Sequence, residues 1–236
     1  MKIGLVSCRS ENGNTAFNLS QIERFLKLNE GRADLLCFGE AFLQGFDALS
    51  WNYESDRNVA ITRDSPTFQQ LKNWTVKYQT ALLLGYLERD QESIYSSCAV
   101  IDGGKIIHNY RRISKGWKEY TRTDDHYCEG NEVTDFLFRG RKMMIALCGD
   151  LWEFPERFRT DGLLLWPVYV NYSLEQWQDG LVQDYANQAA LVCQEALMVN
   201  PLDRDPVSHG GAFHFCKGKI VERIPFDTEA VLITEA

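Results

Sequence analysis

Two residues lie at the ends of apolar, strand-like runs, where protein folds commonly present reactive side chains. The apolar, strand-like run 143–147 ends at Cys148, and Gly149 follows at once, so the chain can turn sharply and leave the thiol at a sheet edge. A thiol presented in this way suits nucleophilic catalysis. A helix that begins beside it, over residues 153–158 with Pro155 in its first turn, would favour the thiolate. The alternative is a core cysteine that acts only as a small hydrophobic residue.

Glu40 repeats this arrangement earlier in the chain. The apolar run 35–38 ends at Gly39, and the acid comes next. Because the ends of strands on one edge of a sheet converge, Glu40 and Cys148 are expected to face the same crevice. The alternative is an acid at a helix N-terminus, where it favours the helix dipole.

Composition restricts the class of protein and its partners. A chain of 236 residues with 44% hydrophobic and 25% charged residues is predicted to form one soluble domain over residues 1–236. The net charge of -8 and the absence of a basic stripe argue against nucleic acid, and no run is long enough to span a membrane. Seven cysteines without CxxC spacing disfavour both a disulfide framework and a zinc site, so we predict a cytoplasmic protein without a bound metal.

The pattern of apolar residues predicts an α/β protein. Helical spacing occurs at 20–28, 65–77 and 174–195, and Asp102-Gly103-Gly104 and Gly218 mark two hairpins. Parallel units near the N-terminus followed by hairpins indicate two sheets packed face to face and covered by helices. Strands are predicted at 2–7, 34–38, 80–87, 96–101, 105–110, 142–148, 162–166, 197–200, 212–216 and 231–234.

On these motifs the sequence resembles the nitrilase, or carbon-nitrogen hydrolase, superfamily. The matching segments are Phe38-Gly39-Glu40, the run from Gly104 to Arg112, and Cys148-Gly149-Asp150-Leu151-Trp152-Glu153-Phe154-Pro155-Glu156. The resemblance extends over nearly the whole chain. It implies a four-layer α-β-β-α sandwich with two mixed sheets, and it implies a homodimer.

The resemblance also implies a Glu-Lys-Cys triad. Glu40 would be the general base, Cys148 the nucleophile, and a lysine ammonium would stabilise the oxyanion, with the N–H of Gly149 as a second donor. The residue that aligns without a gap to the family lysine is Arg112, which can stabilise an anion but holds its proton. Lys115 takes the role if the chain bulges there, and we predict Glu40, Lys115 and Cys148 as the catalytic residues.

Further contacts and alternatives follow from the same resemblance. Arg112, Gly149 and Trp152 are predicted to contact the substrate or the oxyanion, and Asp124 and Asp125 are candidates for a supporting acid. The expected substrate is a small amide, an N-carbamoyl compound or a nitrile, and no cofactor is needed. Two other functions remain open: a binding module on the same fold that has lost catalysis, and a metal-dependent phosphodiesterase with a similar sandwich.

Overall fold

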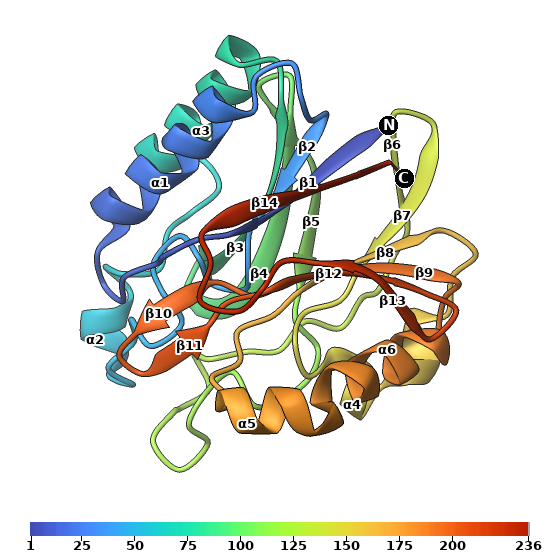
Figure 1. Ribbon diagram of the computed structural model, residues 1–236. Helices are drawn as coiled ribbons and strands as arrows, with labels where there is room; N and C mark the ends of the chain where they lie inside the picture. Colours follow the sequence, from blue (N-terminus) through green and yellow to red (C-terminus); the bar gives the residue numbers. More distant parts are fainter. Residues whose placement is uncertain (236) are drawn as a thin grey trace.

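Two six-stranded sheets form the frame of the protein. The structure, a computed structural model, describes residues 1–235 (Figure 1). The strands are β1 (Lys2–Ser7), β2 (Leu35–Cys37), β3 (Ala81–Asp90), β4 (Ser93–Asp102), β5 (Lys105–Arg111), β6 (Phe136–Phe138), β7 (Arg141–Ile145), β8 (Leu163–Pro167), β9 (Glu195–Val199), β10 (Leu202–Arg204), β11 (Val207–His209), β12 (Ala212–Cys216), β13 (Lys219–Arg223) and β14 (Ala230–Glu235). The first sheet has the order β14-β1-β2-β3-β4-β5, the second has the order β13-β12-β9-β8-β7-β6, and β10 pairs with β11 alone.

Helices cover the outer faces of both sheets. In Figure 1, α1 (Thr15–Leu28) and α3 (Pro66–Lys77) lie together against the first sheet, while α4 (Asp150–Glu153), α5 (Leu174–Gln176) and α6 (Val182–Ala190) lie on the side of the second. A short α2 (Tyr53–Asp56), a 3₁₀ turn (Pro155–Phe158) and a π-helical turn (Trp177–Leu181) complete the helical structure of residues 1–235. The predicted four-layer sandwich of two mixed sheets is therefore confirmed. Within the same residues, every helix is too short or too polar to serve as a membrane span.

Local sequence signals place several elements correctly. Ser65 caps the helix that begins at the predicted range 65–77, because its side chain accepts a hydrogen bond from the N–H of Phe68 at 3.3 Å at the start of α3. Both predicted hairpins are present, since β4 pairs with β5 and β12 pairs with β13, each antiparallel. The parallel pairing of β1 with β2 and of β2 with β3 matches the expected parallel units.

The helix predicted over residues 174–195 is wrong in its extent. It is divided by the π-helical turn, where Gly180 adopts a φ of 108°, which lies outside the helical region. It also ends at Ala190, and β9 begins at Glu195. The tertiary fold needs a strand there to pair with β8, and that pairing overrides the helical spacing of the preceding residues.

The helix after Cys148 begins earlier than predicted. α4 starts at Asp150 with Gly149 as its N-cap, and Pro155 begins a separate 3₁₀ turn. The turn at Cys148 thus leads directly into a short helix. This difference brings the N-terminus of α4 to the residue that follows the thiol.

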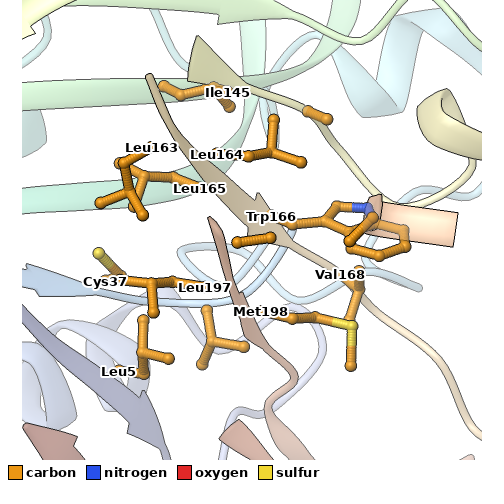
Figure 2. Packing of buried hydrophobic residues seen from close by; sticks show 14 of the residues in the cluster. Leu5, Cys37, Ile145, Leu163, Leu164, Leu165, Trp166, Val168, Leu197 and Met198 are labelled. Atoms are coloured by element: carbon orange, nitrogen blue, oxygen red, sulfur yellow. The ribbon is translucent and has the colours of Figure 1, made fainter. Parts of the chain in front are cut away.

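The main core lies between the two sheets. Figure 2 shows buried side chains from both sheets filling this space, among them Leu5 and Cys37 of the first and Leu165 and Leu197 of the second. Removing this apolar surface from water is the main force that holds the sheets together. A separate buried cluster lies under α1 and α3 and includes Phe25 and Phe68.

The packing brings the ends of β2 and β8 together across the sheets. The backbone N–H of Glu40, three residues after β2, donates to the carbonyl of Val168, one residue after β8, at 3.2 Å. β7 runs parallel to β8, so Cys148 emerges at the same edge of the second sheet. Glu40 and Cys148 are therefore both tied to the end of β8, because the N–H of Cys148 donates to the carbonyl of the neighbouring Pro167.

Leu165→Ala should show how much stability the inter-sheet core provides. Leu165 is 1% exposed, so its truncation should lower the free energy of unfolding by about 2–5 kcal/mol. Leu191→Ala is the matched control, because Leu191 is 63% exposed and should change stability by less than about 0.5 kcal/mol. Urea denaturation followed by circular dichroism measures both. Equal effects of the two changes would contradict the assignment of the core.

Candidate active site

Cys148 lies in a strained turn between β7 and α4. Its φ is 39°, in the left-handed region that non-glycine residues rarely adopt and that costs about 1–3 kcal/mol. Two hydrogen bonds hold the turn: the N–H of Cys148 donates to the carbonyl of Pro167, and the indole N–H of Trp166 donates to the carbonyl of Cys148, both at 3.0 Å. The half-buried thiol donates to the carbonyl of Tyr169 at 3.6 Å. The turn therefore displays the sulfur at the strand end, as the sequence predicts.

Glu40 is fully buried, and its two carboxylate oxygens differ in their surroundings. Oε1 accepts hydrogen bonds from the hydroxyl of Ser96 at 2.8 Å and from Nη1 of Arg112 at 2.9 Å. Oε2 is buried and has no hydrogen-bond partner among residues 1–235. An unpaired buried carboxylate oxygen is costly, so its persistence points to a functional role.

Gly85 makes room for the turn that carries Glu40. A Cβ at position 85 would lie 2.4 Å from the carbonyl oxygen of Gly39 and 2.7 Å from the Cα of Glu40. Only a glycine of β3 allows the backbone of the first sheet to pass so close to this turn. The position of Glu40 is thus set by backbone contacts as well as by its ion pair.

Arg112 is the buried cation of this site. Its side chain is 3% exposed, and besides Glu40 it donates from Nε to the hydroxyl of Ser114 and from Nη2 to the carbonyl of Lys115, both at 2.8 Å. Burial disfavours the charged guanidinium, but the negative charges of Glu40 and Asp150 outweigh it and raise the pKa of Arg112. The guanidinium thus stays charged beside the thiol and the carboxylate.

The side chain of Lys115 does not join this group. Lys115 is exposed, and its ammonium lies over the ring of Tyr120, 5.3 Å from the ring centroid. The backbone of Lys115 contacts the site instead. Its carbonyl accepts a hydrogen bond from Arg112, and its N–H donates to Oε2 of Glu153 at 3.2 Å. The structure therefore brings together Glu40, Arg112 and Cys148 and keeps the ammonium of Lys115 in solvent.

The predicted supporting acids also lie in solvent. Asp124 and Asp125 are both exposed, and Oδ1 of Asp124 accepts from the backbone N–H of His126 at 3.0 Å. Asp124 therefore shapes the turn that carries His126. Neither residue has the burial that distinguishes Glu40.

Asp150 connects two segments of the site, a role that no single sequence motif predicted. Its buried carboxylate accepts from the hydroxyl of Tyr110 at 2.6 Å and from the N–H of Leu147 at 2.8 Å. It also accepts from the N–H groups of Ile113 at 3.2 Å and Ser114 at 2.9 Å. One side chain thereby ties the segment that carries Arg112 to the turn that carries Cys148.

Gly149 contributes an unused donor and a close contact. Within residues 1–235 its N–H makes no hydrogen bond, although the N–H groups of Cys148 and Asp150 on either side are both paired. A Cβ at position 149 would lie 2.6 Å from Nη2 of Arg112, so the glycine lets the guanidinium approach the nucleophile turn. A free N–H next to the thiol is the arrangement that an oxyanion requires.

The thiol is protonated at neutral pH. Burial, followed by the negative charge of Glu40, raises the pKa of Cys148 to about 12, while Arg112 opposes this rise. A proton acceptor is therefore needed at the moment of attack. Arg112 is already fully protonated, which leaves the carboxylate of Glu40 for that task.

Two solved structures illustrate the shared fold. XC1258 from Xanthomonas campestris, a CN-hydrolase superfamily protein with an arsenic adduct in its active site, superposes with a TM-score of 0.81 at 18% identity over 99% of this chain and 89% of that one. A mutant of the amidase from Nesterenkonia sp. AN1, which shows the result of Michael addition of acrylamide at its active site cysteine, has a TM-score of 0.79 at 16% identity over 100% and 93% of the two chains. At these identities the likeness establishes the fold of the protein.

The family follows from the sequence match. The carbon-nitrogen hydrolase model matches residues 2–235, and the protein therefore belongs to the carbon-nitrogen hydrolase family. An (R)-stereoselective amidase from a Pseudomonas species is 31% identical over 160 residues, which are 68% of this chain and 55% of the amidase. The family that the sequence motifs indicate is confirmed.

The matches to relatives cover only part of those proteins. They span 55%, 35% and 26% of the three curated relatives found. The activity, substrate and partners of the whole protein, including the expected homodimer, therefore remain proposals. The cytoplasmic location likewise stays a prediction.

Glu40→Gln should lower the pKa of the Cys148 thiol. Removing the negative charge that raises this pKa should lower it from about 12 and increase the thiolate fraction at neutral pH. The midpoint of the pH dependence of iodoacetamide labelling, followed by mass spectrometry of the Cys148 peptide, measures this pKa.

Cys193 provides an internal control in the same digest. Burial raises the pKa of Cys193 to about 12 as well, without Glu40 among the causes, so its labelling should not change. A labelling midpoint for Cys148 that does not fall to lower pH in Glu40→Gln would contradict this effect of the carboxylate charge.

Proposed function

We propose that the protein hydrolyses the carbon–nitrogen bond of small amides through a thioester on Cys148. The observation that carries this proposal is the buried, unpartnered Oε2 of Glu40 beside a protonated thiol. Ser96 and Arg112 hold the other oxygen, so the carboxylate is oriented with one basic atom free. The family match supports the same chemistry.

Acylation begins with one proton transfer. Oε2 of Glu40 takes the thiol proton as the sulfur of Cys148 bonds to the amide carbon, and the carbonyl oxygen gains the negative charge. The N–H of Gly149 and the guanidinium of Arg112 stabilise that oxyanion. Glu40 then gives its proton to the nitrogen, the carbon–nitrogen bond breaks, and ammonia or an amine leaves.

In deacylation, water is the nucleophile and the sulfur of Cys148 is the leaving group. Glu40 takes a proton from water as the water oxygen bonds to the thioester carbon. The tetrahedral intermediate collapses, the carbon–sulfur bond breaks, and the sulfur recovers the proton from Glu40 as the acid departs. An N-carbamoyl compound or a nitrile presents a carbon open to the same attack.

Arg112 is the cation of this proposed mechanism. A guanidinium has five N–H donors, and three acceptors are already named: Glu40, Ser114 and the carbonyl of Lys115. The remaining N–H groups on Nη1 and Nη2 are available to the oxyanion. Because arginine does not release its proton, every proton transfer falls to Glu40.

Cys148→Ala should abolish amide hydrolysis. Loss of the nucleophile should lower the rate of ammonia release by at least about 10³-fold without changing the fold. Ammonia release from a panel of primary amides, with circular dichroism as the folding control, measures this. Turnover that survives the substitution would refute the mechanism, and a wild-type protein that neither hydrolyses an amide nor forms an acyl adduct would favour the binding module.

Arg112 and Lys115 can be separated by a pair of substitutions. Arg112→Lys keeps the charge but cannot bond Glu40, Ser114 and the Lys115 carbonyl at once, so kcat should fall by about 10²-fold. Lys115→Ala removes an exposed ammonium and should change kcat by less than about three-fold. The reverse result would assign the catalytic cation to Lys115.

A further inference from the structure

Two exposed aromatic side chains come from the segments that follow β7 and β8. Trp152 lies in α4, which follows Cys148, and Tyr172 lies in the segment that follows β8. Trp152 is 44% exposed and Tyr172 is 36% exposed. Large aromatic residues with this exposure offer flat apolar surface to a ligand.

Both side chains rest on buried aromatic residues. Trp152 meets Tyr185 edge to face, with ring centroids 5.3 Å apart, and Tyr172 meets Trp177 in the same way at 5.6 Å. Tyr185 and Trp177 are each 2% exposed and lie 5.6 Å apart. The exposed pair is therefore held by a rigid base.

This aromatic group is continuous with the nucleophile turn. Tyr185 packs against Trp166 at 5.1 Å between ring centroids, and the indole N–H of Trp166 donates to the carbonyl of Cys148. Trp166 therefore lies between Tyr185 and the turn that carries the thiol.

Tyr185 and Trp177 also connect the two exposed residues. Trp152 packs against Tyr185, Tyr185 packs against Trp177, and Trp177 packs against Tyr172. Trp152, Tyr172 and Tyr185 therefore belong to one packed cluster. Trp152, Tyr172 and Tyr185 are called the aromatic wall below.

The cations near the site do not suit an anionic substrate group. Arg112, the buried cation of the site, is paired with Glu40, and the ammonium of Lys115 lies over Tyr120. The three side chains of the aromatic wall carry no charge at neutral pH. A carboxylate on the substrate would gain little from these groups.

We propose that the aromatic wall is the subsite for the acyl group, and that it selects primary amides whose carbonyl carbon carries a flat, uncharged aromatic group. This inference rests on the proposed function of Cys148. A flat ring stacks on or meets the edges of Trp152 and Tyr172, while the amide carbon lies at the sulfur. Trp152, predicted from sequence as a substrate contact, receives a defined role in this way.

The test compares benzamide with propionamide. In the wild-type protein the ratio of kcat/KM for benzamide to that for propionamide should exceed one, and Trp152→Ala should lower it roughly ten-fold. Tyr172→Ala should lower it in the same direction, and Trp152→Phe should retain most of it. Leu137→Ala, at a residue of β6 that is 71% exposed, is the control and should leave the ratio unchanged.

A binding measurement separates the subsite from the chemistry. In Cys148→Ala, calorimetry should show benzamide binding that weakens roughly ten-fold when Trp152→Ala is added. If the wild-type protein hydrolyses neither amide, the proposed function fails, and the calorimetric comparison still decides the subsite. Equal benzamide affinity in the two proteins would overturn the inference, as would a preference for anionic succinamate or cationic glycinamide over benzamide.

Discussion

The buried ion pair between Glu40 and Arg112 is the contact on which the site depends. Both side chains are almost fully removed from water, which costs several kcal/mol per ion unless the geometry and the remaining hydrogen bonds are good. Ser96, Ser114 and the carbonyl of Lys115 supply those hydrogen bonds. The pair therefore does more than neutralise charge: it uses one carboxylate oxygen and leaves the other as the free base.

The nucleophile turn depends on the same assembly. The left-handed conformation of Cys148 needs support, and it receives that support from strand β8 through Pro167 and Trp166. Asp150 then joins this turn to the segment that carries Arg112 through the N–H groups of Ile113 and Ser114. Hydrogen bonds thus join the segments that carry the thiol, the base and the cation, which is what preorganised electrostatic catalysis requires.

Several helices and strands could be predicted because the sequence signals for them are local. The cap at Ser65 and the hairpin at Gly103-Gly104 follow from side-chain and backbone preferences within a few residues. The helix over 174–195 could not be predicted in its full form, because its end is decided by the pairing of β9 with β8. β6 and β10 are three residues long, and neither lies in a longer apolar run like the one that contains β2, so they carry too little periodicity to be predicted.

The sequence by itself determined that Glu40 and Cys148 leave strand ends, because each follows an apolar run and has a glycine beside it. The apolar pattern of these runs indicates strands whatever their neighbours in the fold, and the glycines permit the turns that follow. Only the tertiary structure decided that the guanidinium of Arg112, and not the ammonium of Lys115, lies beside them. The two residues are three positions apart in one segment, and nothing local says which side chain points inward. That direction is set by Glu40 and Asp150, which come from distant parts of the chain and meet this segment only after both sheets have packed.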